Sequence, residues 1–162
     1  MDFFGLSLFF DRLKVFFLIM ASSSGPICYS LYILNKTGGL IYNADFSKDS
    51  PKNTTNDHLR LGGSFYSMHA ISSKLSPTGK ASGIQTLETP TFKLRCFQTT
   101  TGVKFYMTAP PKQTQQEMKK MLLRVYASYT DYVMKNPFYE PEQPIRCEKF
   151  HIELESYLNC GQ

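Results

Sequence analysis

The sequence predicts an α+β domain built on one antiparallel sheet, with helices packed on its faces. Short runs of β-branched and aromatic residues come in two groups, a hairpin and a later three-strand meander. The segments after each group carry apolar residues three and four positions apart, a spacing that gathers them on one side of a helix. The order β-β-α-β-β-β-α-α has no internal repeat, and the length of 162 residues suits a single domain.

The first hairpin occupies residues 27–44. Residues 27–34 are rich in β-branched and aromatic side chains, and residues 40–44 form the returning strand. Between them, Asn35-Lys36-Thr37-Gly38-Gly39 supplies glycines, which adopt the positive φ angles that a tight turn requires. The polar residues 45–55 then lead, as a loop, to the first helix.

The first helix is expected to begin at Asn56 or Asp57, whose side chains can accept a hydrogen bond from its first turn. Gly62-Gly63 either weakens this helix or lets another backbone approach it closely. Pro77-Thr78-Gly79 ends it. We expect the side of the helix that faces the core to carry Leu59, Phe65, Met68, Ile71, Ser72 and Leu75.

The meander that follows has three strands, at residues 84–88, 91–99 and 103–109. The second strand places alternate residues on one side, and the third does the same after a turn at Thr100-Thr101-Gly102. Pro110-Pro111 ends the sheet, because proline donates no ladder hydrogen bond. The alternating apolar residues are Phe92, Leu94 and Cys96 in the second strand and Val103, Phe105 and Met107 in the third.

A long amphipathic helix is predicted over residues 113–135, followed by a proline-bracketed corner and a second helix. Asn136-Pro137 stops the first helix, because proline moves the preceding residue out of the α region. A tight connection covers residues 138–143, and residues 144–148 lead into the second helix. No catalytic group stands out in this unit, so we interpret it as a docking surface. The apolar side of the long helix carries Met118, Met121, Leu122, Val125, Tyr129, Tyr132 and Val133.

The composition is that of an ordinary folded domain. Hydrophobic residues make up 42% of the chain and charged residues 19%, which argues against wholesale disorder. The net charge of +5 favours anionic partners only weakly, because the basic residues are dispersed. The four cysteines, Cys28, Cys96, Cys147 and Cys160, form no CxxC pair. We interpret Cys28 and Cys96 as buried free thiols within strands.

Residues 1–25 form an N-terminal extension ahead of a domain at residues 26–162. Asp11, Arg12 and Lys14 interrupt its apolar residues, so no run reaches the roughly 20 residues of a membrane span. Three interpretations stay open: an upstream extension before a natural start at Met20, a membrane-surface helix, or a signal peptide. We favour the first and expect a cytosolic protein.

The sequence carries no clear pattern for enzyme chemistry. His58, His69 and His151 are scattered, and Cys147 with His151 makes only half a metal site, so we expect no metal and no cofactor. Cys96 with His69 leaves a thiol enzyme open, although the apolar strand around Cys96 favours a core cysteine. The helices carry no arginine stripe, so nucleic acid is not an expected partner.

Three groups of residues, in chain order, carry a family resemblance. The first is the turn Asn35-Lys36-Thr37-Gly38-Gly39 with Leu40-Ile41-Tyr42, and the second is the meander at residues 82–105. The third comprises Tyr132, Lys135-Asn136-Pro137-Phe138-Tyr139, Pro144-Ile145-Arg146-Cys147-Glu148 and Phe150. Together these groups resemble the synbindin family, the small longin-like subunits of the TRAPP vesicle-tethering complex.

The resemblance implies a longin-like (SNARE-like, profilin-like) fold, a five-stranded antiparallel sheet with one helix on one face and two on the other. It also implies a non-catalytic TRAPP subunit in ER-to-Golgi transport, part of a core that acts as guanine-nucleotide exchange factor for a Rab GTPase. Its partners would be other small TRAPP subunits and the Rab GTPase. Its location would be cytoplasmic, peripheral at the cis-Golgi and endoplasmic reticulum through the complex.

The same resemblance implies which residues bind partners: Lys135, Asn136, Pro137, Phe138, Tyr139, Pro144, Ile145, Arg146, Cys147 and Glu148. Arg146 can make charge-assisted hydrogen bonds, while Phe138 and Tyr139 can bury large apolar areas. The competing interpretation is structural, with Asn136-Pro137 ending the helix and Phe138 filling the core. Residues 46–55 are too few for the PDZ-like insert of animal synbindins. The alternatives in function are another longin-type trafficking adaptor and, less favoured, a small cytosolic thiol enzyme using Cys96 or Cys147.

Overall fold

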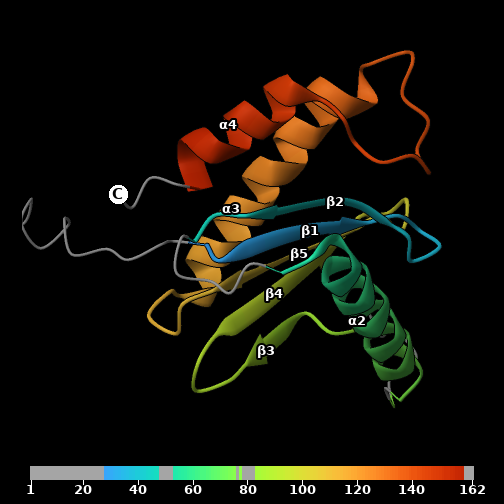
Figure 1. The fold of residues 1–162 in the computed structure, drawn as a ribbon. Helices are drawn as coiled ribbons and strands as arrows, with labels where there is room; N and C mark the ends of the chain where they lie inside the picture. The colour runs from blue at the N-terminus through green and yellow to red at the C-terminus, as the bar shows by residue number, and fades with distance from the viewer. Residues whose placement is uncertain (1–27, 48–52, 76, 78–82, 159–162) are drawn as a thin grey trace, which may run out of the picture.

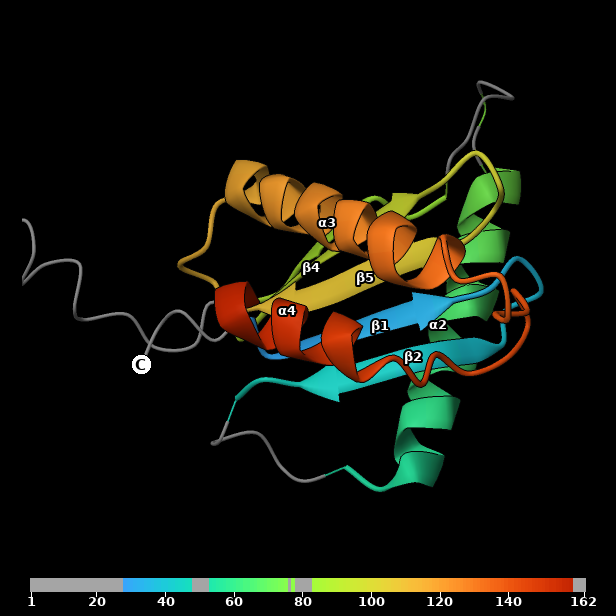
Figure 2. The same ribbon diagram turned by 90° about the horizontal axis from the view of Figure 1, so that it is seen from above.

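The computed structural model describes residues 28–47, 53–75, 77 and 83–158, and in them one antiparallel sheet has the strand order β2-β1-β5-β4-β3. Helix α2 lies against one face of this sheet, and α3 and α4 lie against the other (Figures 1 and 2). The predicted fold is therefore confirmed. The strands are β1 (Ser30–Leu34), β2 (Leu40–Asp45), β3 (Thr86–Glu88), β4 (Lys93–Gln98) and β5 (Lys104–Ala109). The helices are α2 (Thr55–Leu75), α3 (Gln115–Tyr129), the π-helical turn η1 (Thr130–Met134) and α4 (Glu148–Leu158).

The first hairpin turn is held by the side chain of Asn35. Its Oδ1 accepts hydrogen bonds from the backbone N–H groups of Thr37 (3.0 Å) and Gly39 (2.7 Å). Gly38 takes a φ of +93°, the left-handed conformation that glycine adopts without a steric penalty. The turn thus fixes the register in which β2 returns along β1.

The larger core cluster lies between the sheet and the helices α3 and α4. Phe105 of β5 meets the rings of Tyr126 and Tyr129 edge-on, with centroids 5.8 and 5.3 Å apart. Tyr42 of β2 packs against Phe150 of α4 in the same way, at 5.2 Å. Most of the apolar side of α3 that was expected from the sequence is buried here: Met118, Leu122, Val125, Tyr129 and Val133.

Tyr132 departs from that expectation, because 38% of its surface is exposed. The last turn of the helix is the π-helical η1, which takes more residues per turn than an α-helix. This change of pitch leaves Val133 as the buried residue of the turn and turns Tyr132 toward solvent. The N-terminus of α3 has a complete capping box, in which Thr114 and Glu117 satisfy each other's backbone N–H groups.

Helix α2 packs on the opposite face through Phe65 and three residues that are not hydrophobic. Its buried residues are His58, Gly62, Phe65 and His69, spaced i, i+4, i+7 and i+11. Phe65 stacks on Tyr106 of β5 with ring centroids 4.1 Å apart. A Cβ on Gly62 would lie 3.2 Å from Leu34 Cδ2, so this glycine does allow close approach, whereas Gly63 faces open space.

The predicted apolar side of α2 is therefore wrong except at Phe65. Leu59, Met68, Ile71 and Leu75 are exposed, and Ser72 is half-buried. The physical reason is that two histidines and a glycine occupy the contact positions, so the helix lies close to the sheet with its larger apolar residues directed elsewhere. Leu61, Met68, Ile71 and Leu75 follow one line along the helix, and we call these four residues the α2 stripe.

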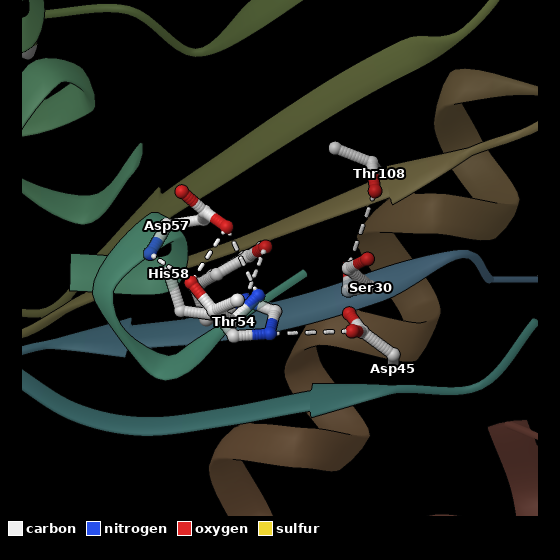
Figure 3. Close-up of polar contacts among 7 residues, drawn as sticks. Ser30, Asp45, Thr54, Asp57, His58 and Thr108 are labelled. Atoms are coloured by element: carbon white, nitrogen blue, oxygen red, sulfur yellow. Dashed lines mark hydrogen bonds and ion pairs between the residues drawn. The ribbon is translucent and has the colours of Figure 1, made fainter. Parts of the chain in front are cut away.

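The start of α2 also differs from the prediction, since Thr54, and neither Asn56 nor Asp57, provides the cap. Thr54 Oγ1 accepts a hydrogen bond from the Asp57 N–H (3.3 Å), and Asp57 Oδ2 accepts one from the Thr54 N–H (3.0 Å). One residue further, His58 points from the helix toward Asp45 of β2 (Figure 3), with Nε2 and Oδ2 3.4 Å apart. The other ring nitrogen of His58 lies 3.0 Å from the Tyr32 hydroxyl, so the first turn is tied to two strands.

Candidate partner-docking site

The segment between η1 and α4, residues 136–147, forms an ordered turn that we call the corner. Asn136 organises its beginning by accepting two hydrogen bonds. The Asn136 side-chain oxygen accepts from the Phe138 N–H (3.1 Å), and its carbonyl oxygen accepts from the Tyr139 N–H (3.1 Å). Pro137 fixes φ between them. The helix therefore stops where the sequence predicted, and the turn is ordered by local bonds.

Phe138 stands at the tip of this turn with 92% of its surface exposed. The structural interpretation, in which Phe138 fills the core, is wrong, because Ile145 and Phe150 are the buried apolar residues of this region. An exposed phenylalanine contributes nothing to the core. Its backbone is already held in one conformation, so burying the ring under a partner would cost little further ordering entropy.

Tyr139 packs against the core cluster and Ile145 bonds to the sheet, so both hold the corner on the domain. The Tyr139 hydroxyl donates to the Gln143 carbonyl oxygen (3.1 Å), which closes the turn on itself. Burial, with a smaller contribution from the neighbouring Tyr129 hydroxyl, raises the pKa of Tyr139 to about 12, so it remains a protonated donor at neutral pH. The Ile145 N–H donates to the Ile41 carbonyl oxygen (2.8 Å) on the outer edge of β2.

The corner, η1 and the start of α4 enclose a cavity of about 500 Å³. Lys135 and Pro137 do not line this cavity. The other eight of the ten predicted site residues do: Asn136, Phe138, Tyr139, Pro144, Ile145, Arg146, Cys147 and Glu148. Sequence reasoning missed four further large or polar lining residues, Tyr132, Glu140, Gln143 and Lys149. Only the structure brings these four to the cavity, because the π-turn at η1 and the closed corner decide where they lie.

The charges around the cavity are mixed and mostly exposed. Lys135 is paired with Asp131 on the preceding turn of the helix. Arg146 is exposed, and within the described ranges no ion pair involves it. Glu148 opens α4, where a negative charge interacts favourably with the helix dipole. Arg146 and the exposed Lys149 are thus the cations lining the cavity that are available to an anionic group of a partner.

The two buried cysteines, Cys28 and Cys96, give no support to thiol chemistry, whereas Cys147 is half-buried and lines the cavity. Burial raises the pKa of the Cys96 thiol to about 12, so the reactive thiolate is scarce at neutral pH. The His69 ring is bonded elsewhere, its Nε2 lying 2.8 Å from Gln98 Oε1. Cys28 is fully buried, and its pKa is also raised by burial. No group of three metal-binding side chains occurs among the described residues.

Comparison with known proteins places these features in a family. The sybindin-like family model matches residues 28–160, which is the whole of the described domain. The chain belongs to the sybindin-like family. The resemblance read from the turn, the meander and the C-terminal signature is thereby confirmed.

Curated relatives agree with this assignment. The chain is 52% identical over 130 residues to "Trafficking protein particle complex subunit 4" of Dictyostelium discoideum, a match that covers 80% of this chain and 94% of that protein. It is 46% identical over 112 residues to the protein of the same name from Bos taurus. That match covers 69% of this chain and half of the length of the bovine protein.

A solved structure supports the fold alone. The Roadblock/LC7 domain from Streptomyces avermitilis superposes with a TM-score of 0.54 at 10% identity, covering 71% of this chain and 92% of that chain. At this identity the likeness concerns the arrangement of strands and helices. Among the described helices, none is both long and apolar enough to cross a bilayer.

Proposed function

We propose that this chain is a non-catalytic subunit of a TRAPP vesicle-tethering complex and that its corner docks a Rab GTPase. The family match and the subunit names of the relatives support the first part. The observation that carries the second part is Phe138, an exposed aromatic ring on a pre-ordered turn beside a cavity. Aromatic side chains presented in this way are frequent energetic centres of protein interfaces.

The assembled core, in this proposal, promotes nucleotide exchange on the GTPase, and this chain contributes contacts rather than chemistry. Phe138 supplies apolar area, and Arg146 supplies a charge-assisted hydrogen bond to an anionic group of the GTPase. Lys135 and Pro137 lie outside the cavity, and their role is to end η1 and to set the direction of the turn.

Other small TRAPP subunits are the second class of partner, and the α2 stripe offers them a surface. Its four residues are each between 47% and 76% exposed, and together they form an apolar line on one helix. A line of this kind suits a complex subunit, since burial against another chain removes it from water. The complex would carry the chain to its site of action, in the cytoplasm and peripherally on cis-Golgi and ER membranes.

A reconstituted complex tests the docking role of the corner. Arg146→Glu is expected to keep the melting temperature and the subunit assembly of the wild type but to slow GTPase nucleotide exchange about tenfold. That factor corresponds to the loss of one charge-assisted hydrogen bond. Lys112→Glu is the matched control, because Lys112 is also an exposed cation but lies outside the corner. A lowered melting temperature together with lost assembly would show that Arg146 is structural.

Alkylation tests the thiol-enzyme alternative. Iodoacetamide at pH 8 should leave Cys28 and Cys96 unmodified in the folded chain and modify them after unfolding, because both are buried and have raised pKa values. Mass spectrometry of tryptic peptides reads the outcome. Rapid modification of Cys96 in the folded chain would support a thiol nucleophile instead.

A further inference from the structure

A second cavity, of about 550 Å³, lies where both hairpin turns meet the end of α3. Its floor is buried, with Asn35, Thr99 and Tyr129 each less than 9% exposed. Its volume falls in the range of sites that bind small ligands or a few residues of a peptide. Pro141 and Glu142 of the corner form one end, so the corner has a cavity on either side. We call this second cavity the hairpin groove.

The walls of the hairpin groove are apolar. Tyr126 and Met134 come from the helix and Val103 from the end of the β4–β5 turn. Tyr126 is 37% exposed and Met134 is 48% exposed, so a large part of each side chain is in contact with water. Covering these surfaces would yield hydrophobic free energy in proportion to the area buried. The groove therefore favours an apolar group, such as an aliphatic side chain.

The rim of the groove carries two charges of opposite sign. Lys36 lies on the first hairpin turn and Glu142 lies on the corner. Within the described ranges, neither side chain takes part in an ion pair. The hydroxyl groups of Thr99 and Thr101 are 2.8 Å apart and satisfy each other, so they place no strong polar demand on an occupant. A matching occupant is apolar in its middle, with an acidic group toward Lys36 and a basic group toward Glu142.

We propose that the hairpin groove binds a short extended peptide segment in which an aliphatic residue has an acidic residue two positions before it and a basic residue two positions after it. Alternate side chains of an extended peptide lie on the same side of its backbone, so all three groups face the groove, and the aliphatic side chain enters between Val103, Tyr126 and Met134. This site goes beyond the corner, and its test uses the isolated full chain, so it does not depend on docking of a GTPase at Phe138.

Peptide titration tests the proposal directly. Acetylated and amidated Glu-Gly-Leu-Gly-Lys is added to the ¹⁵N-labelled full chain, and amide shifts are followed by NMR. We expect saturable shifts at Val103, Thr130 and Met134, and binding about threefold or more tighter than for Glu-Gly-Leu-Gly-Glu, the usual scale of an exposed ion pair. Replacing the leucine of the peptide by asparagine should abolish saturation. Absence of saturable shifts at the groove for both charged peptides would overturn the proposal.

A charge reversal supplies the sharper control. Glu142→Lys places two cations on the rim, so the order of affinity of the two peptides should reverse in favour of Glu-Gly-Leu-Gly-Glu. Glu140→Lys changes a carboxylate two residues away that lines the other cavity, and it should leave the order unchanged. Met134→Ser should weaken both peptides, while Ile152→Ser, at a comparably exposed residue of α4, should weaken neither. An unchanged order in Glu142→Lys, or the same change in both charge variants, would contradict the proposed orientation and overturn the site.

Discussion

Helices α2 and α3 begin alike and pack differently. Each opens with a threonine cap and an acidic residue three positions later, Thr54 with Asp57 and Thr114 with Glu117. Yet α3 buries Met118, Leu122, Val125 and Tyr129 in the core shared with the sheet and α4, whereas α2 leaves its leucines, methionine and isoleucine exposed. The two helices lie on opposite faces of one sheet (Figure 2). The comparison shows that the same periodic signal marks a core in one helix and an uncovered surface in the other.

The contact residues explain the difference. Gly62 brings the backbone of α2 close to Leu34, and His58 bonds to a buried tyrosine. These contacts need small or polar side chains, so the larger apolar ones are free to face away. In α3, Leu122 and Val125 meet a sheet face that is itself aliphatic and aromatic. The exposed α2 stripe is therefore available to another chain, whereas the buried Leu122 and Val125 of α3 are not.

The largest expected effect is the loss of stability on truncating a buried residue of α3, compared with truncating an exposed residue of α2. Leu122→Ala, at 1% exposure, should destabilise the domain by about 2–5 kcal/mol through lost burial and a residual cavity. Ile71→Ala, at 58% exposure, should change the free energy of unfolding by no more than about 0.5 kcal/mol. Urea denaturation of the isolated chain measures both. Equal losses would mean that the α2 stripe is covered within this chain.

The paired glycines of α2 provide the next comparison. Gly62→Leu should destabilise by about 1–3 kcal/mol, because the new side chain would be forced against Leu34 and Leu40. Gly63→Ala should stabilise by about 0.5–1 kcal/mol, because its Cβ meets open space and alanine favours the helix. Thermal unfolding followed by circular dichroism distinguishes them. A stabilised Gly62→Leu variant would contradict the close packing of α2.

The smallest expected effect is on the pH dependence of stability, and it comes from the threonine–carboxylate capping pairs that begin both helices. Hydrogen bonds from Thr54 and from Thr114 lower the pKa of Asp57 and of Glu117 below their ordinary values. A lowered carboxyl pKa means that the capping contribution is fully present above the unfolded-state pKa and is lost as the pH falls through the folded-state value. Stability should thus fall between about pH 5 and pH 3, and the fall should be shallower in Glu117→Gln and Asp57→Asn. An unaltered slope in both variants would show that other carboxylates dominate.

Much of this architecture was readable from the sequence, because period-two and period-3.6 patterns and turn glycines report local structure directly. The hairpin, the meander, the long helix and its stop at Asn136-Pro137 are confirmed. The buried side of α2 was not readable, since His58, Gly62 and His69 carry no hydrophobic signal. The π-turn at η1, which exposes Tyr132, also has no local signature in the residues that form it.

The docking site was predicted only in outline. The corner was visible as a proline-bracketed aromatic segment, but whether Phe138 lies in the core or in solvent depends on tertiary packing. Ile145 and Phe150 fill the core there and leave Phe138 outside. The hairpin groove was not predicted, because it joins two turns, a helix end and the corner, which are distant in sequence.

The most direct test of the account is nucleotide exchange by the assembled complex carrying Phe138→Ser. The account predicts an unchanged melting temperature, intact assembly and exchange slowed about thirtyfold, as loss of an interface hot spot of about 2 kcal/mol implies. Ile152→Ser, which removes another exposed apolar side chain, should exchange at the wild-type rate. Wild-type exchange by an assembled Phe138→Ser complex would contradict the central claim that the corner docks the GTPase.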